Sequence, residues 1–518
     1  MPAIGIDLGT TNSCVAVVID GNPQVIKDDV GNPTTPSYVS YRSGGAVVGR
    51  LAKLDAIEAP SEVVYSAKRL IGRAADAPEV SKASEVCSYQ VIKNPDGEVG
   101  IRAGNATTTP GDVSTTILSY LKDLATGALG QPPNGVVITV PAYFNDRQRK
   151  ATKDAGERAG LKVLRLVNEP TAAAIAYGFG KDIEKRVAVY DLGGGTFDIS
   201  VLDISEGVYE VVGTHGDSYL GGVDFDNRLV THLIRKHVLP RSTVTVDKLS
   251  LLRLRQAAEN AKIELSTKSS SLISLPAFLG LDRLEVTIER AELEELVKDL
   301  VQQTISVCEQ CLTHAKLAKN EVDEVILVGG MTRMPMVRRA VEAFFEKAPR
   351  TDVNPDEAVA VGAALQANSL EVGDEKILLL DVTPLTLGIA SFGDLFSPVL
   401  PKNTKVPVSL TRTFSTVRDE QEAVEIVVLQ GESKKASENT FLGKFTLTNI
   451  PKMPRMQPKI DVTFRLDADG ILHVTARDQA TGLEQQIDVK EFLDKKETMK
   501  GSTASFRDKD FPKLKDAK

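Results

Sequence analysis

Two segments of the 518-residue chain share one pattern, in which an apolar strand is followed by an Asp and then by a turn rich in Gly and Thr. They are residues 5–11 and residues 189–198. Glycine lets backbone N–H groups approach phosphate oxygens, and threonine hydroxyls add donors. One such turn is more typical of a plain β-hairpin. Two copies predict facing lobes that hold one nucleotide from both sides.

An Asp stands at the end of the strand in each copy, Asp7 in the first and Asp191 in the second. Magnesium sheds its waters reluctantly, so a carboxylate in this place is suited to hold Mg²⁺ through water molecules. The repeated pattern therefore predicts a magnesium–nucleotide site between the two turns.

A third glycine turn, residues 328–333, also follows an apolar strand. Alone it is equally typical of a helix start that binds no ligand, but beside the other two it predicts contacts to the nucleoside. The chain contains no Gly-x-x-x-x-Gly-Lys-Ser/Thr segment, which argues against the P-loop fold.

The N-terminal part of the chain, residues 1–373, alternates short β-branched runs with amphipathic stretches, as α/β domains do. Polar residues and a short apolar run then predict an interdomain linker at 374–382. We expect an α/β domain before this linker and a separate domain after it.

The C-terminal part, residues 383–490, has the alternation of apolar and polar side chains that indicates half-buried strands. Asp469-Gly470 and Thr481-Gly482 are turn signals between such runs, so we expect hairpins of an all-β sandwich. Residues 491–518 are rich in charge and are expected to form a mostly disordered tail.

Composition argues against several classes of protein. The net charge of −8 is unlike the basic faces of nucleic-acid-binding proteins. No apolar run approaches the roughly 18 residues of a membrane helix, and no basic and apolar leader begins the chain. Four cysteines in so long a chain favour a reducing compartment, and we expect a cytoplasmic protein.

Cys308, Cys311 and His314 have a spacing that suggests a metal site at first sight. The surrounding pattern predicts a helix, on which the two cysteines share a face while His314 lies roughly 240° away from Cys308. No fourth ligand stands nearby, so we interpret the cysteines as structural.

Seven short sequence motifs resemble those of one protein family. Residues 7–13, 140–144, 168–174, 191–198, 328–335, 378–381 and 467–472 resemble the signatures of the DnaK-type, seventy-kilodalton heat-shock chaperones. The resemblance runs from about residue 3 to residue 490. It implies an actin-like, two-lobed ATPase domain followed by a β-sandwich. It also implies a stress-response chaperone that uses ATP hydrolysis to control its grip on short, extended, apolar segments of unfolded proteins.

The resemblance also assigns roles in ATP binding and hydrolysis, residue by residue. The expected catalytic residues are Lys68, Glu169, Asp191, Thr196 and Asp198, and the expected magnesium residues are Asp7 and Asp191, through waters. The expected contacts to ATP or ADP are Gly9, Thr10, Thr11, Asn12, Gly193, Gly194, Gly195, Glu259, Lys262, Ser266, Gly329, Gly330, Arg333 and Asp356. The family resemblance admits K⁺ as a further cofactor. Without the family resemblance, Lys68 would be interpreted as a surface lysine. Glu259, Lys262 and Ser266 would be interpreted as one exposed face of a helix.

The sandwich would hold the peptide by main-chain hydrogen bonds and one side-chain pocket. The matching positions are Ile389, Phe392, Phe414, Ser415, Val417, Val424 and Ile426. Phe392 and Val417 fall where the family's arch closes over the peptide, whereas Ile389 and Ile426 are equally well explained as sandwich core. The matching linker residues are Leu378, Leu379, Leu380 and Asp381.

Co-chaperone contacts follow from the same resemblance. Arg165 and Asp381 match positions that receive the J-domain activator, although each also suits an ordinary surface ion pair. Residues 274–290 are shorter than the exchange-factor loop of bacterial members, so we expect J-domain stimulation and doubt a bacterial-type exchange factor.

The chain departs from the family pattern in three places. Val223 stands where Glu is usual and Pro33 stands where Arg is common. We also expect the family's helical lid of roughly a hundred residues to be missing. Two other functions share the ATPase fold, a small-molecule kinase and a non-hydrolysing regulator or assembly protein. A small-molecule kinase would leave the linker and the β unit without a role. A non-hydrolysing protein would not need Lys68, Glu169, Asp191 and Asp198 together.

Overall fold

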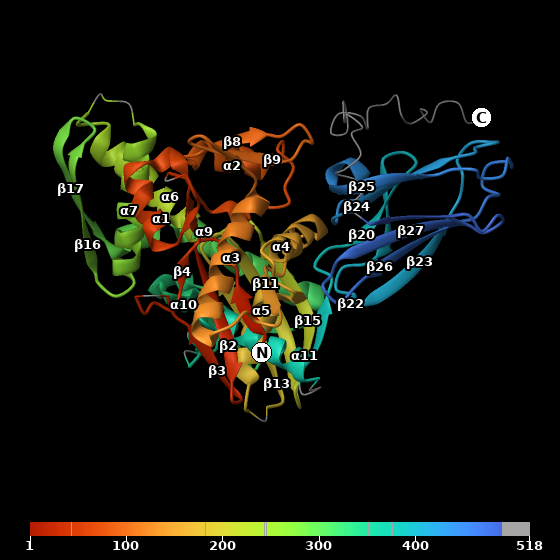
Figure 1. Cartoon of the computed structure of the whole chain (residues 1–518), viewed down its shortest axis with the longest axis horizontal. Coiled ribbons are helices and arrows are strands. Elements are labelled where there is room, and N and C mark those ends of the chain that lie inside the picture. Colours follow the sequence, from red (N-terminus) through yellow and green to blue (C-terminus); the bar gives the residue numbers. More distant parts are fainter. Residues whose placement is uncertain are drawn as a thin grey trace. The chain divides into compact units, whose positions relative to one another are not determined.

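The computed structural model describes residues 1–488 apart from 29, 43, 182, 243, 245, 351 and 374–376. It contains two compact units, both drawn in Figure 1. The first comprises Met1–Asn94, Glu98–Phe144 and Ala151–Leu380, and the second comprises Pro95–Gly97, Asn145–Lys150 and the chain from Asp381 onward. The expected disordered tail, and with it the expected lack of a lid, lies outside the described residues.

One half of the first unit is built on a sheet of β1 (Ile4–Asp7), β2 (Asn12–Ile19), β3 (Asn22–Ile26), β4 (Thr35–Pro36), β11 (Val136–Val140) and β12 (Val163–Asn168). The main path runs β12-β11-β1-β2-β3, and β4 also pairs with β2. β1 pairs in parallel with β11 and antiparallel with β2. The β-branched run of β11 is buried throughout, as expected of a strand covered on both faces.

The other half repeats this arrangement with β13 (Lys185–Leu192), β14 (Phe197–Ser205), β15 (Val208–Asp217), β18 (Glu324–Val328) and the start of β19 (Leu378–Val382). β13 takes the place of β1, because it pairs in parallel with β18 and antiparallel with β14. The predicted α/β architecture of two lobes is confirmed. The two glycine-rich turns come at equivalent points, one after β1 and the other after β13.

Two helices, α5 (Glu169–Gly178) and α11 (Ala358–Val372), pack against each other and join the two sheets. α11 lies on β1, β2 and β11, while α5 lies on β13 and β14. The contact is so close that a Cβ atom added at Gly362 would lie 1.7 Å from the carbonyl oxygen of Ala172. Glycine at this position therefore sets the distance between the helices.

The remaining α-helices are α1 (Arg50–Glu58), α2 (Pro78–Val86), α3 (Pro110–Leu129), α4 (Asp146–Arg158), α6 (Gly222–Leu233), α7 (Lys248–Leu265), α8 (Arg290–Leu296), α9 (Lys298–Ala315) and α10 (Pro335–Phe345). The smaller strands of the first unit are β5 (Tyr38–Ser40), β6 (Val47–Val48), β7 (Val63–Tyr65), β8 (Gln90–Lys93), β9 (Val99–Ala103), β10 (Ala106–Thr108), β16 (Ser270–Phe278) and β17 (Leu281–Glu289). Cys308 and Cys311 are both buried in α9. Within the described parts of the chain, none of the helices is both long and apolar enough to span a membrane.

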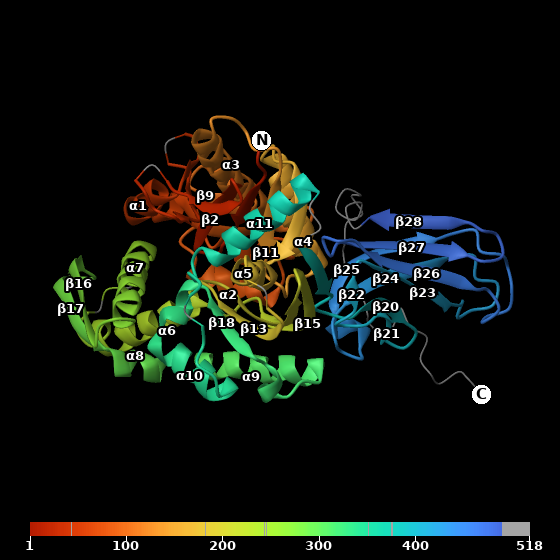
Figure 2. The ribbon, with the colours of Figure 1, turned by 90° about the horizontal axis from the view of Figure 1, so that it is seen from below.

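β16 and β17 form a hairpin beside α7 at the edge of the first unit (Figures 1 and 2). Its turn is Leu279-Gly280, with φ angles of 50° and 76°. Two successive residues of positive φ are typical of a tight hairpin turn. The segment 274–290, which we expected to be a short exchange-factor loop, forms most of this hairpin. Its last residue, Arg290, begins α8.

The segment expected as a linker contains a strand. Leu378–Leu380 of β19 pair in parallel with Val208–Glu210 of β15, and the Leu378 N–H donates to the carbonyl of Gly207 at 3.0 Å. The edge of β15 offers unpaired backbone groups, which an extended apolar segment satisfies by adding a strand. The first three residues of β19 therefore belong to the sheet of the first unit.

The second unit contains two antiparallel sheets. The first has the order β21-β20-β24-β25 and the second β23-β26-β27-β28. Their strands are β20 (Leu387–Ser391), β21 (Leu395–Leu400), β23 (Val408–Phe414), β24 (Val424–Gln430), β25 (Thr440–Leu447), β26 (Ile460–Leu466), β27 (Leu472–Asp478) and β28 (Glu484–Asp488). A further short strand, β22 (Lys405–Val406), pairs with Asp381 and Val382 of β19. Residues from both sheets share one core, which makes this unit a sandwich and confirms the all-β prediction. The hairpins predicted at Asp469-Gly470 and Thr481-Gly482 are confirmed.

Replacing Gly362 by Ala should destabilise the first unit, because the new methyl group meets backbone that has no rotamer with which to yield. We expect a loss of about 1–3 kcal/mol, measured by urea unfolding. The matched control is Gly127→Ala in α3, where a Cβ has nothing within 4 Å and a gain of roughly 0.5–1 kcal/mol is expected. Equal effects of the two substitutions would contradict the close approach of α11 to α5.

Candidate active site

The turns that follow β1 and β13 contact each other. A Cβ atom at Gly194 would lie 2.0 Å from Thr11 Oγ1, and one at Gly195 would lie 2.5 Å from Thr10 Cγ2. These distances leave no room for a side chain, so the two glycines allow the threonines of the other turn to approach. The predicted facing of the two turns is therefore present in the folded chain.

Each turn is also folded tightly on itself. A Cβ at Gly9 would lie 1.9 Å from the carbonyl oxygen of Asn12. In the second turn, the Gly193 N–H donates to the carbonyl of Thr196 at 3.1 Å. Thr10 and Thr196 are buried, so hydroxyl groups and glycine backbone occupy the same small region.

A buried ion pair lies beside these turns. Lys68 is in the short helix η2 (Ala67–Arg69), and Glu169 is the first residue of α5. The Lys68 Nζ lies 2.5 Å from Glu169 Oε1, and the two side chains are 5% and 9% exposed. A charge pair this far from water depends on both partners, since either one alone would be a buried, uncompensated charge.

Three aspartates complete the charged cluster. Asp191 lies opposite Asp198 in the β13–β14 ladder, and Asp198 Oδ1 accepts the N–H of Tyr143 at 3.0 Å. Burial, aided by Glu169, raises the pKa of Asp7 to about 7, although Lys68 opposes this shift. Burial also raises the pKa of Asp191 well above its ordinary range, with Glu169 and Asp198 adding to the effect.

The donor set fits a magnesium-bound phosphate ligand. The carboxylates of Asp7, Glu169 and Asp191 interact with the positive charge of Lys68, and Asp198 adds a fourth carboxylate beside Asp191. Such an excess of buried carboxylate is relieved by a cation. Among the described residues no three His, Cys, Asp or Glu side chains are grouped closely enough to hold a metal directly. Mg²⁺ usually keeps several of its waters in proteins, and buried carboxylates can hold such a hydrated ion through those waters.

The third glycine turn lies against the end of β13. Gly329 has a φ of 83°, and a Cβ there would lie 2.3 Å from the carbonyl oxygen of Leu192. Gly330 begins the short helix η5 (Gly330–Arg333). At its end, Arg333 Nη2 lies 2.6 Å from Asp356 Oδ2. The fold thus brings all three predicted turns together.

The predicted adenosine residues of α7 have different surroundings. Lys262 is buried, and its Nζ lies 2.7 Å from Asp226 Oδ1 and 3.2 Å from the Gly222 carbonyl oxygen. Glu259 pairs with Lys53 of α1 at 3.1 Å, and the Ser266 hydroxyl donates weakly to the carbonyl of Lys262 at 3.4 Å. A Cβ at Gly222 would approach both Lys262 Nζ and Met331 Sδ, so α7 and the third turn meet there.

Arg69 is a residue of the site that sequence reasoning did not single out. Its guanidinium is bonded to the Asp224 carboxylate, its Nε donates to the Gly195 carbonyl at 3.2 Å, and it lies 4.5 Å from the ring centroid of Tyr219. It thereby connects η2 to the turn after β13 and to α6. Its one sequence signal is its place next to Lys68. Asp224 keeps this contact although Val223 replaces the usual Glu.

The predicted peptide-binding residues divide into two sets by burial. Ile389 and Ile426 are core residues of the sandwich, and Phe414 and Val424 pack against that core. The Ser415 hydroxyl donates to the Pro458 carbonyl at 2.6 Å. Phe392 and Val417 are 40% and 45% exposed. Of the seven positions, these two offer the most apolar surface to a ligand.

One comparison with known proteins bears on the whole chain. A protein-family model described as Hsp70 protein matches residues 3–511. The match includes the strands, turns and charged cluster of the first unit and the sandwich of the second.

The raised pKa of Asp7 predicts a pH dependence for the nucleotide-free chain. The folded state holds this proton more tightly than the unfolded state does, so stability falls as pH rises from about 4 towards 7. Between about pH 5.5 and pH 7.5 we expect Asp7 to account for a loss of about 1–2 kcal/mol. This change in the free energy of unfolding is measured by urea unfolding at both pH values, with a metal chelator present.

Asp7→Asn should remove this part of the pH dependence. The control is Asp299→Asn, which changes an exposed carboxylate paired with Arg228 and should leave the pH dependence as it is in the unchanged chain. If Asp7→Asn kept the full difference between the two pH values, burial of Asp7 would not be its cause.

Proposed function

The chain belongs to the Hsp70 family, and we propose that the cluster around Lys68 and Glu169 is its ATP-hydrolysing centre. As a family member the protein is an ATP-dependent chaperone that binds extended hydrophobic peptides, and its ATPase activity is coupled to the chaperone cycle. The observation that carries the residue assignment is the buried Lys68–Glu169 pair beside the two contacting turns.

Phosphoryl transfer to water needs chiefly positioning and neutralisation of negative charge. We assign Lys68 to the γ-phosphate, because its ammonium is the cation inside the carboxylate cluster. Glu169, Asp191 and Asp198 would orient the attacking water, and a carboxylate of this set would accept its proton, while Thr196 would contact the phosphates. The glycine backbone of both turns, with Thr10, Thr11 and Asn12, would donate to the phosphate oxygens.

Magnesium would add charge neutralisation on the phosphates when it is bound. Asp7 and Asp191 would hold its water ligands, as their buried carboxylates suggest. We also retain K⁺ as an expected cofactor, on the family resemblance alone. For the nucleoside we propose Glu259, Lys262 and Ser266 of α7, and Gly329, Gly330, Arg333 and Asp356 around the third turn.

For the peptide we propose the surface of the sandwich that carries Phe392 and Val417. Their exposure supports direct contact, and Phe414, Ser415 and Val424 would form the adjoining surface. Ile389 and Ile426 would shape the pocket from the core rather than contact the ligand. The domain bounds that go with this proposal are 1–373, 374–382 and 383–490, followed by the tail.

Regulation by partners stays a proposal drawn from the family resemblance. Arg165 is half-buried in β12 and Asp381 is half-buried in β19, and both are proposed J-domain contacts. The short β16–β17 hairpin supports our doubt about a bacterial-type exchange factor. We propose a cytoplasmic location and a function without nucleic-acid or membrane partners, on the charge and composition of the chain.

Lys68→Ala should lower ATP turnover about 100-fold or more, because it removes charge stabilisation that matters most in the transition state. Nucleotide affinity should change less than about tenfold. Single-turnover hydrolysis and equilibrium binding of nucleotide separate the two effects. Lys82→Ala, which removes an exposed lysine of α2, is the control. Turnover near that of the unchanged chain at saturating Mg-ATP would refute the assignment, and thermal unfolding confirms that the variant is folded.

Changing both Leu379 and Leu380 to Asp should abolish stimulation of the ATPase by peptide and leave basal hydrolysis intact. These side chains are half-buried where β19 pairs with β15, and full burial of a leucine contributes about 1.5–3 kcal/mol. The measurement is ATP turnover with and without an unfolded peptide. Faster hydrogen exchange of the Leu378 amide would report loss of the strand pairing.

Leu239→Asp, at a leucine that is 58% exposed, is the control for the added charge. Full peptide stimulation in the double variant would show that β19 does not carry the coupling. The same assay tests the proposed function itself, because a small-molecule kinase needs a different acceptor and a non-hydrolysing regulator shows no turnover.

A further inference from the structure

A pocket of about 260 Å³ lies in the first unit beside the end of β18. Among the described residues, its charged lining consists of three arginines, Arg333, Arg338 and Arg350, with no acidic side chain. The rest of the lining is Leu327, Thr332, Val353, Asn354 and Pro355. None of the glycines of the two phosphate turns lines this pocket, so it is separate from the proposed phosphate site.

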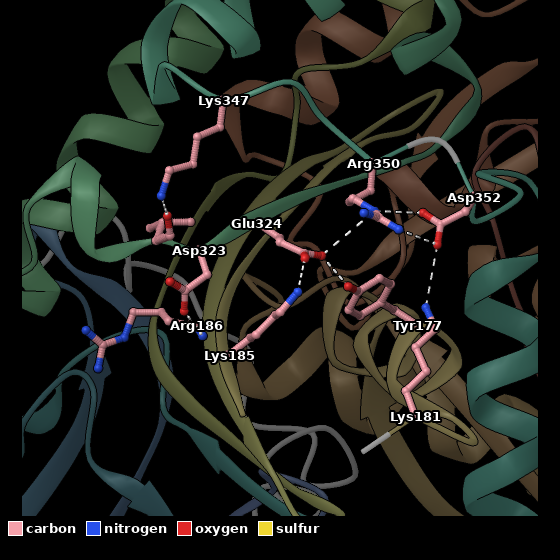
Figure 3. Close-up of polar contacts among 10 residues, drawn as sticks. Tyr177, Lys181, Lys185, Arg186, Asp323, Glu324, Lys347, Arg350 and Asp352 are labelled. Carbon is pink, nitrogen blue, oxygen red and sulfur yellow. Dashed lines mark hydrogen bonds and ion pairs between the residues drawn. The ribbon is translucent and has the colours of Figure 1, made fainter. Parts of the chain in front are cut away.

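Two of the arginines are held in place by carboxylates outside the lining. The Arg333 Nη2 lies 2.6 Å from Asp356 Oδ2 and 3.3 Å from Asn354 Oδ1. The Arg350 Nε and Nη2 each lie 3.0 Å from one oxygen of Asp352, as Figure 3 shows. These bonds fix the two guanidinium groups at the edge of the pocket.

The carboxylates around Arg350 are shared with other cations. Figure 3 shows Asp352 between Arg350 and Lys181, and Glu324 between Arg350, Lys185 and Tyr177. The Arg350 Nε is 3.8 Å from Glu324 Oε2, so this second contact is looser than the one with Asp352. Asp352 and Glu324 are therefore shared among several cations, so each offsets the charge of Arg350 only in part.

Arg338 differs from its two neighbours. Its Nε donates to the Thr332 carbonyl at 3.0 Å, and no carboxylate among the described residues pairs with it. The next residue, Arg339, pairs with Glu294 at 2.6 Å and does not line the pocket. Arg338 thus brings to the pocket a positive charge that the surrounding chain does not compensate.

We propose that this pocket binds a small phosphate-class anion, either free phosphate or the phosphate of a monoester. Guanidinium groups present planar pairs of N–H donors that match phosphate oxygens, and three of them surround one space. The volume is just below the roughly 300–1,000 Å³ of pockets for drug-sized ligands, which suits a phosphate group. The arginines are exposed, so binding should weaken with added salt.

The test measures binding by calorimetry with the full chain. The nucleotide site is filled by a non-hydrolysable ATP analogue with Mg²⁺, so that the phosphate positions there are taken. The probes are inorganic phosphate and phenyl phosphate, titrated into the unchanged chain, Arg338→Ala and Arg339→Ala. The two variants lose the same charge from adjacent exposed positions on α10, so Arg339→Ala is the matched control.

We expect one saturable site in the unchanged chain, affinity lowered by about tenfold or more in Arg338→Ala, and unchanged affinity in Arg339→Ala. Tighter binding of inorganic phosphate would identify a free anion as the ligand, and tighter binding of phenyl phosphate would identify a monoester. Equal loss in both variants would show a general charge effect and overturn the proposal. So would the lack of saturable binding of either probe up to about 10 mM. Arg333 is not used, because it is also proposed to contact the nucleoside.

Discussion

The contact between the two glycine turns is the constraint on which the first unit depends. Gly194 and Gly195 leave space that Thr10 and Thr11 of the other turn occupy. Any side chain at those glycines would separate the turns and with them the ends of β1 and β13. Asp7, Lys68, Glu169 and Asp191 act on one another electrostatically because those ends meet. The geometry of the charged cluster is therefore a consequence of the turn contact, which the sequence encodes in two short, similar phrases.

The same contact gathers charges that oppose folding. Buried carboxylates at the ends of β1 and β13 have raised pKa values because water is excluded and like charges are close. A cluster optimised for stability alone would replace them with apolar side chains. Their presence is understandable if the cluster is organised around a ligand that brings positive charge and accepts hydrogen bonds. The energetic cost in the free chain and the proposed catalysis have the same physical source.

Local sequence patterns predicted much of the fold. Features that depend on contacts between residues far apart in the chain could not be predicted from them. The strands β11, β13 and β18 and the β26–β27 hairpin follow from β-branched runs, alternation and turn residues, each visible within about ten positions. The Arg69–Asp224 pair joins residues far apart in the chain, and nothing near either one indicates the other. The segment 378–380 was expected as linker because its strand character depends on the edge of β15, which is remote in sequence. The arginine pocket likewise draws its lining from β18, η5, α10 and the segment 350–355.

The way β19 is held bears on the coupling role proposed for it. Its first three residues pair with β15 through backbone bonds, which depend little on side-chain identity. The side chains contribute modestly, because Leu378 is 50% exposed and its two neighbours are only half-buried. A short strand held in this way has a low free energy of local opening compared with the buried strands β11 and β13. If β19 couples the two sites, as proposed above, differential binding at the nucleotide site would need to supply only a few kcal/mol to shift the balance between paired and released β19. Stronger burial of these leucines would then fix the strand in place and remove the proposed response.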